Sequence, residues 1–125
     1  MTHIGRKAWA MTGGRIPLRG NGPEPDYSSQ DQICLLNAGP LDAKVEMTVF
    51  YADRDPVGPY RMSVPARRTR CVRINDLIDP FPVPLDTDYA CLLHSDEPVV
   101  VQFLRRDTSQ AENAWLNLSA MPVDG

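Results

Sequence analysis

The most chemically distinctive stretch of the sequence is VPARRTRCVRIND, residues 64–76, which places four arginines within seven positions. Arginine carries a planar fork of donors suited to carboxylates, phosphates and flat rings. Arg68 and Arg70 share sequence parity with the apolar residues of the stretch, so one uninterrupted strand would aim them at the core. We expect a turn or bulge near Arg67 and Arg68 to reset the register. The alternative is a polar pocket in which Arg68 and Arg70 pair with carboxylates.

A second chemically suggestive stretch is RGNGPEPDY, residues 19–27. Its glycines offer backbone amides, Asn21 an amide side chain, Glu24 a carboxylate and Tyr27 an aromatic ring, a combination typical of small-molecule sites. The same residues also suit a purely structural loop, because glycine and proline form tight turns and Asn tolerates left-handed backbone geometry. Both interpretations stay open at this point.

The two stretches suggest one recognition surface for a small polar ligand. Trp9 would offer a flat apolar face for a sugar ring or base, the arginines fixed donors, and the glycine-rich loop acceptors. The predicted ligand-binding residues are Trp9, Asn21, Glu24, Arg67, Arg68, Arg70, Asn75 and Asp76. The alternative is that the four arginines pair with acidic loops of neighbouring subunits.

Signatures of catalysis are missing from the sequence. There is no G-x-S-x-G elbow, no P-loop and no H-E-x-x-H motif, and the two histidines, His3 and His94, lie far apart. Acidic residues in proline-rich turns are mostly solvated or cap backbone amides. We therefore expect a protein that is not an enzyme and that has no cofactor or metal site.

The overall charge argues against a dedicated nucleic-acid binder. The chain of 125 residues has a formal net charge of −3 and a pI near 5.2, whereas nucleic-acid binding normally requires a broad excess of Lys and Arg. The arginines of residues 64–76 also fall on both faces of a strand rather than in one basic stripe. DNA binding is not favoured.

The expected location follows from two absences in the sequence. No run of 18 apolar residues is present, and the N-terminus MTHIGRKAWAM lacks the apolar core of a signal peptide. We expect a cytoplasmic protein. Cys34, Cys71 and Cys91 are odd in number and form no C-x-x-C pair, which predicts three unpaired, mostly buried thiols.

Elements that would position these residues are short strands. Proline and glycine interrupt the chain about every ten residues, which leaves little room for helices. We predict one domain, residues 1–125, with an all-β fold: an antiparallel, jelly-roll-like β-sandwich of about eight short strands. The expected strands are residues 6–11, 32–37, 43–53, 60–64, 69–74, 88–94, 99–106 and 112–121.

Three details of this strand assignment are open to test. The segment HSDEP, residues 94–98, is expected to separate two strands. The run VVVQFL, residues 99–104, lacks polar alternation at its start, which predicts a central strand buried on both faces, in the sandwich or at a subunit contact. The C-terminal stretch also fits helical spacing, but a strand is favoured. Phe50, which breaks the polar face of residues 43–53, could lie under a partner subunit.

The blocks AWAMTGGRIPLRGNGPEP, LLNAG, YADRDPVGPYRMSVPARRTRCVRINDL, DTDYA and VVVQFLRRDTSQAENA together resemble the sensory rhodopsin transducer family along nearly the whole chain. The resemblance implies a small soluble β-sandwich that assembles as a homotetramer. It also implies a cytoplasmic signalling partner of a membrane sensory rhodopsin. The alternatives are a binding domain for a small, sugar-like molecule without a rhodopsin partner and, less favoured, a DNA-binding regulator.

Overall fold

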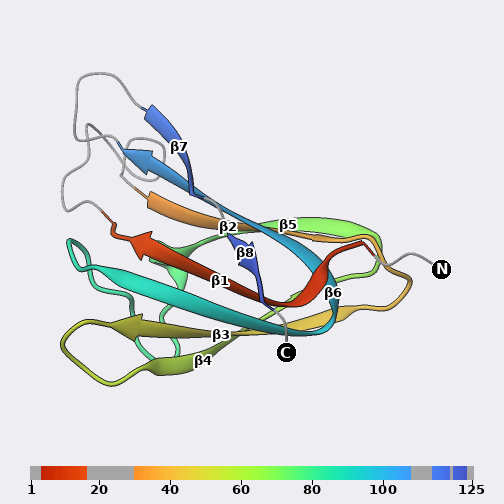
Figure 1. Ribbon diagram of the computed structural model, residues 1–125, viewed down its shortest axis with the longest axis horizontal. Helices are drawn as coiled ribbons and strands as arrows, with labels where there is room; N and C mark the ends of the chain where they lie inside the picture. Colours follow the sequence, from red (N-terminus) through yellow and green to blue (C-terminus); the bar gives the residue numbers. More distant parts are fainter. Residues whose placement is uncertain (1–3, 17–29, 108–113, 119, 124–125) are drawn as a thin grey trace.

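The computed structural model describes residues 4–16, 30–107, 114–118 and 120–123 of the chain (Figure 1). Nearly all regular structure in these residues is antiparallel β-sheet, as predicted. The strands are β1 (Arg6–Gly14), β2 (Gln30–Asn37), β3 (Ala43–Tyr51), β4 (Val57–Val64), β5 (Arg68–Arg73), β6 (Tyr89–Asp107), β7 (Ala114–Leu118) and β8 (Met121–Pro122). A single turn of 3₁₀ helix, η1 (Ile74–Asp76), follows β5.

The strands form two layers that share β6 (Figure 1). The first layer, sheet A, has the strand order β4-β3-β6-β1-β8. The second layer, sheet B, has the order β5-β2-β6-β7. The architecture is therefore an all-β antiparallel sandwich, and the stretch rich in arginine forms an edge strand of sheet B.

The longest strand, β6, belongs to both sheets. Its first part pairs with β3 as far as Ser95 and with β1 as far as Val99, and its second part, from Val100 onward, pairs with β2. The chain bends between these parts, where the Asp96 carboxylate accepts a hydrogen bond of 2.7 Å from the Lys44 backbone N–H. The prediction that residues 94–98 separate two strands is wrong, because ladder pairing continues on both sides of a bend.

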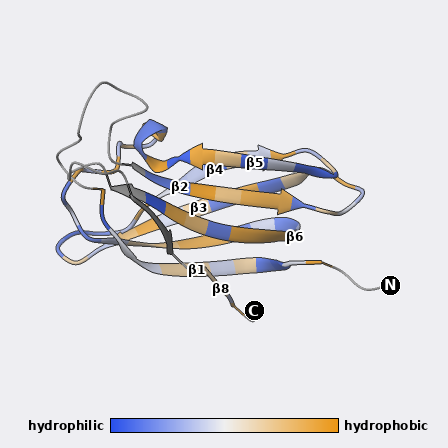
Figure 2. Ribbon diagram, turned by 90° about the horizontal axis from the view of Figure 1, so that it is seen from above, coloured by the Kyte–Doolittle hydropathy of each residue, from blue (hydrophilic) through white to orange (hydrophobic). Residues whose placement is uncertain are grey.

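Alternating side chains build the core between the layers. In β3 the odd-numbered residues from Ala43 to Val49 are buried and Lys44 and Glu46 are exposed, as the sequence pattern predicts. Figure 2 shows that hydrophobic residues are concentrated on β2, β3, β4 and β6. The run 99–104 is central, as expected; Gln102 is exposed in the single chain, so the sandwich itself does not bury both faces.

The cysteines differ from the prediction. Cys34 on β2 and Cys71 on β5 lie directly opposite each other and form a disulfide, so the expectation of three unpaired thiols is wrong for this pair. Sequence spacing could not reveal the bridge, because its partners are 37 residues apart and meet only through strand pairing. Cys91 is free and buried, and burial raises the pKa of its thiol.

Strand pairing confirms two other expectations from the sequence. Residues 114–118 form β7 rather than a helix and pair with the end of β6. Arg67 adopts a left-handed conformation, with φ of 58°, between β4 and β5. This turn resets the register as predicted, and it leaves Arg68 and Arg70 exposed rather than aimed at the core.

Candidate functional site

Arginines of β5 lie on the surface of the edge strand. The residues from Arg68 to Cys71 are all exposed, so neither face of this end of β5 is covered by the rest of the chain. The Nη1 atom of Arg68 donates a hydrogen bond of 3.1 Å to the Arg67 carbonyl, a local contact next to the turn. Arg70 instead reaches across to β4, where its Nη1 donates to the Ser63 carbonyl at 2.9 Å.

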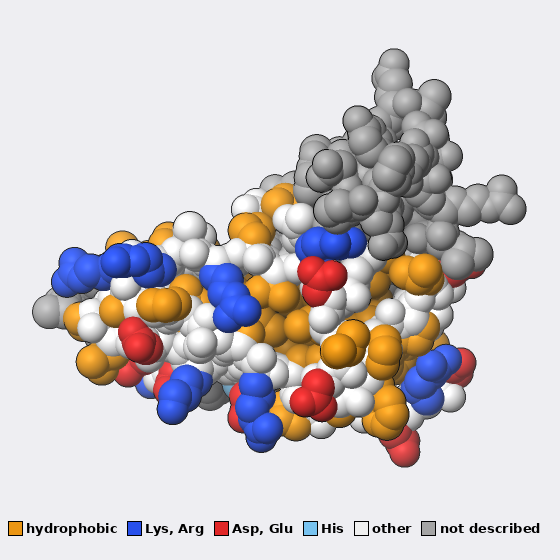
Figure 3. All heavy atoms as spheres, turned by 180° about the vertical axis from the view of Figure 1, so that it is seen from behind, with side chains coloured by type: hydrophobic (Ala, Val, Ile, Leu, Met, Phe, Trp, Pro, Cys, Tyr) orange, Lys and Arg blue, Asp and Glu red, His pale blue; other side chains and the backbone are white. Residues whose placement is uncertain are grey.

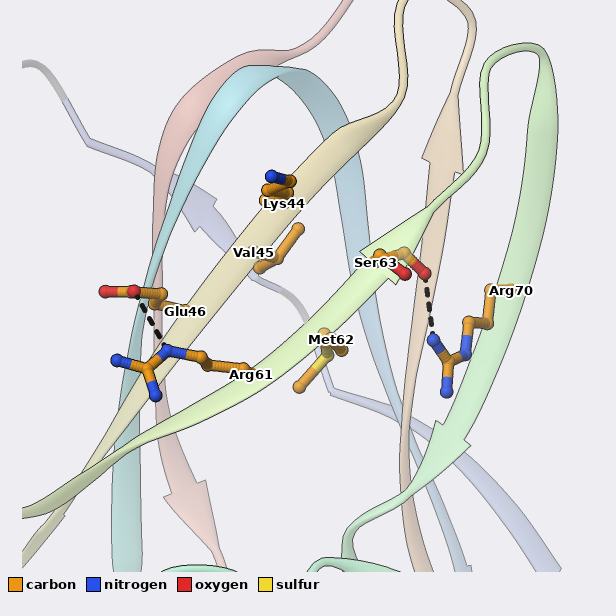
Figure 4. Close-up of a pocket in the computed structure, with 7 residues that line it drawn as sticks. All are labelled: Lys44, Val45, Glu46, Arg61, Met62, Ser63 and Arg70. Atoms are coloured by element: carbon orange, nitrogen blue, oxygen red, sulfur yellow. Dashed lines mark hydrogen bonds and ion pairs between the residues drawn. The ribbon is translucent and has the colours of Figure 1, made fainter.

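Arg70 contributes to a groove formed by β3, β4 and β5, which we call the edge groove (Figure 4). The groove has a volume of about 410 Å³. Its lining residues come from three strands and are mostly charged or polar at the surface: Lys44, Val45, Glu46, Arg61, Met62, Ser63 and Arg70. Figure 4 shows Arg70 extending from β5 toward Ser63, with Arg61 and Glu46 paired further along β4 and β3.

A second cavity of about 420 Å³ lies beside η1. It contains Asp76, one of the predicted site residues, together with the proline-containing segments of residues 58–59 and 77–80. Asp76 also forms an ion pair of 3.5 Å with Arg73 three residues earlier. Arg61 lines both this cavity and the edge groove, and sequence reasoning did not select it.

The remaining predicted residues that the structure describes, Trp9 and Asn75, lie outside the exposed surface of β5. Trp9 lies in the core on β1, 8% exposed, where its indole N–H donates to the carbonyls of Val99 at 2.9 Å and Arg6 at 3.1 Å. Its ring therefore packs within the sandwich. Asn21 and Glu24 lie outside the described residues, and Asn75 is half-buried in η1.

Sequence reasoning missed a buried polar cluster between the sheets. Asp31, 0% exposed on the core face of β2, accepts hydrogen bonds from the Tyr89 hydroxyl at 2.6 Å and the Arg105 Nε at 2.9 Å. Arg105 also donates to the Gly13 carbonyl at 2.9 Å. A Cβ atom at Gly14 would overlap the Tyr89 ring, so glycine is needed where this ring packs.

This cluster has a clear electrostatic consequence. Burial and the adjacent Asp31 carboxylate raise the pKa of Tyr89 well above its ordinary value. The hydroxyl thus stays protonated and donates to the carboxylate. The sequence signal was the parity of Asp31 with Ile33 and Leu35, which places a carboxylate on the core face of β2. Because all three polar groups satisfy one another, the cluster is a structural tie between the sheets.

The outer surface of sheet A carries an apolar row, which we call the sheet A apolar face. Leu92 on β6 lies opposite Ala10 on β1, and Ala10 lies opposite Met121 on β8. Ala90 on β6 lies opposite Phe50 on β3. Met121 is 67% exposed and Phe50 is 39% exposed. Contiguous apolar surface of this kind is typical of protein interaction sites.

The space-filling view shows how surface chemistry is distributed on one side of the molecule. Figure 3 shows hydrophobic side chains gathered in the middle of this side, bordered by basic and acidic groups.

Among the described residues, no three His, Cys, Asp or Glu side chains are grouped so that they could hold a metal ion. Within the same part of the chain, no helix is long and apolar enough to cross a membrane.

This chain is similar to known proteins over most of its length. The family model for the Anabaena sensory rhodopsin transducer matches residues 4–122. A solved structure of the Anabaena sensory rhodopsin transducer is 55% identical in sequence, and the alignment covers 82% of this chain and 99% of that one, with a TM-score of 0.75. The protein in the crystal structure of Thermotoga maritima 1070 is 24% identical in sequence. The alignment covers 97% of each chain with a TM-score of 0.80, which shows a similar fold.

No curated protein matches the chain significantly. The family match nevertheless spans both sheets and all eight strands of the described residues. The identity of 55% to a solved transducer extends over most of the chain. The chain belongs to the Anabaena sensory rhodopsin transducer family.

Proposed function

We propose that this chain is a non-enzymatic signalling protein that acts as the cytoplasmic partner of a membrane sensory rhodopsin. The observation that carries the proposal is the identity of 55% across 99% of the Anabaena sensory rhodopsin transducer. Because the similarity covers nearly the full length of a protein named as a sensory rhodopsin transducer, that role is the one the similarity supports best. The proposal treats residues 1–125 as one transducer-like domain, supported by a core to which both sheets contribute.

The proposal includes assembly as a homotetramer. Exposed apolar residues on sheet A, among them Met121 and Phe50, provide a surface that association of subunits would remove from water. The edge strand β8, which carries Met121, also has backbone groups that a neighbouring subunit can protect. Closed symmetry satisfies both requirements with identical subunits.

Direct binding to the photoreceptor tests the signalling role. The purified chain is titrated onto Anabaena sensory rhodopsin held in lipid nanodiscs, with a light-driven proton-pumping rhodopsin in identical nanodiscs as the control. We expect saturable binding to the sensory rhodopsin alone and a measurable change in its photocycle kinetics. Equal binding to both rhodopsins, or to neither, would contradict the proposed role.

Native mass spectrometry of the same preparation tests the assembly. A homotetramer should appear at four times the chain mass of 13.9 kDa. A monomer at micromolar concentration contradicts the homotetramer but leaves the rhodopsin-binding result to decide the signalling role.

A further inference from the structure

We propose that the edge groove binds a small organic molecule with two anionic groups, carboxylate or phosphate, separated by a short linker. This site is independent of the rhodopsin partner. It retains Arg70 from the predicted recognition surface, but the other residues that carry the inference are Lys44 and Arg61. The groove volume of about 410 Å³ lies within the range typical of small-molecule sites.

The groove is basic although the protein is acidic. Its lining includes three cations, Lys44, Arg61 and Arg70, and one carboxylate, Glu46, whereas the whole chain has a formal net charge of −3. Like charges placed together on a protein surface raise the local concentration of oppositely charged ligands. A negatively charged ligand is therefore the class that this groove favours.

Both arginines of the groove retain guanidinium N–H groups that can donate hydrogen bonds to a ligand. Arg61 contacts Glu46 through Nε at 3.4 Å, and among the described residues its two terminal nitrogens have no hydrogen-bond partner. Arg70 contacts the Ser63 carbonyl through Nη1 alone within the same part of the chain. That contact holds the Arg70 side chain across the gap from β5 to β4 (Figure 4). A side chain already held in place loses less entropy when a ligand binds.

Strand register sets the spacing of the anionic groups. Lys44 lies opposite Ser63, and Glu46 lies opposite Arg61, with the Val45–Met62 pair between them. Positions two residues apart along a strand are separated by about 7 Å. Arg70, which contacts Ser63, joins Lys44 at one end of the groove, and Arg61 lies at the other. A ligand with two anionic groups about 5–7 Å apart would meet a cation at each end.

Matched ligand pairs test this assignment by isothermal titration calorimetry at low ionic strength. Glutarate is compared with butyrate, and fructose 1,6-bisphosphate with fructose 6-phosphate. We expect at least one ligand with two anionic groups to bind about ten times more tightly than its partner with one, as an added charge-assisted contact predicts. A preference for glutarate identifies dicarboxylates as the ligand class, and a preference for the bisphosphate identifies phosphorylated compounds. Equal binding within both pairs overturns the proposal.

Variants then locate the binding. Arg61→Ala and Lys44→Ala remove exposed cations from the groove, so the fold should persist, as circular dichroism can verify. Each should weaken binding of the preferred ligand about tenfold. Arg6→Ala removes the same charge from an exposed position outside the groove and should leave affinity unchanged. If Arg6→Ala weakens binding as much as Arg61→Ala, the groove is not the site and the proposal fails.

Discussion

Among single residues, Asp31 is the one whose replacement should cost the most stability. Asp31→Asn removes the charge that pairs with Arg105, whose side chain is only 17% exposed. A partly buried guanidinium without its carboxylate costs about 3 kcal/mol, and urea unfolding followed by tryptophan fluorescence measures the loss. Asp53→Asn, which breaks the exposed pair with Arg54, should leave stability nearly unchanged. Equal effects of the two substitutions would show that the buried cluster is not a tie between the sheets.

The buried tyrosines should make the folded protein less stable at high pH. Burial is the main cause that raises the pKa of Tyr60 to about 12 and that of Tyr89 above its ordinary value of 10.0. An unfolded tyrosine loses its proton near pH 10, whereas the folded ones keep theirs. Their stabilising contribution is therefore complete below pH 10 and is lost as the pH rises toward 12.

The measurement is urea unfolding at several pH values from 8 to 12. Tyr60→Phe and Tyr89→Phe remove the titrating groups, so the fall in stability above about pH 10 should be shallower in each variant. Tyrosinate absorbance at 295 nm in the native protein provides the second readout. Full ionisation of all four tyrosines near pH 10 in the folded wild type would contradict the predicted shifts.

The placement of a single residue could be predicted from the sequence where its contacts lie within one stretch of the chain. The turn at Arg67 and the exposure of Arg68 and Arg70 followed from parity within one stretch of sequence. Arg61 and Lys44 were missed because their role arises from cross-strand pairing of β3 with β4. Trp9 was assigned to a binding surface because tryptophan can stack on a sugar ring or base. In the structure its indole N–H donates to the Val99 carbonyl and its ring packs inside the sandwich.

At the level of elements, the Cys34–Cys71 bridge ties edge strand β5 to β2. The closed loop spans 37 residues, for which loop-closure entropy gives about 3–4 kcal/mol of stabilisation. Cys34→Ser combined with Cys71→Ser should lose this amount in urea unfolding and should no longer respond to dithiothreitol. Cys91→Ala is the control, because it keeps the bridge and should keep the response to reductant.

Thiol counting checks the bridge directly. Denatured protein should alkylate at one cysteine before reduction and at three after reduction, as measured by intact mass. Alkylation of three cysteines before reduction would contradict the structure at this position and restore the expectation from the sequence.

Most elements could be predicted because their side chains alternate. The pattern of residues 43–51 in β3 is visible from sequence alone, and so is the strand character of residues 114–118. Continuity of β6 through residues 94–98 could not be predicted, because proline and acidic residues normally mark a turn. Here the same residues form the bend by which one strand passes from sheet A to sheet B.

At the scale of the whole molecule, the sheet A apolar face is the surface that should hold the proposed homotetramer together. Phe50→Glu and Met121→Glu each place a charge among Ala10, Leu92 and Ala90, where an interface would bury it at high cost. Both side chains are exposed in the single chain, so the fold itself should tolerate the change. We expect smaller species by light scattering with an unchanged circular dichroism spectrum.

Ile78→Glu makes the same chemical change at a residue that is 69% exposed in the loop after η1 and is not one of the residues of the sheet A apolar face. It should leave the tetramer intact, because a charge placed outside the interface stays in water whether or not the subunits associate. The comparison thus separates a specific interface from a general response to an added charge. If Ile78→Glu dissociates the tetramer while Phe50→Glu and Met121→Glu do not, the subunits associate through the loop between η1 and β6 instead.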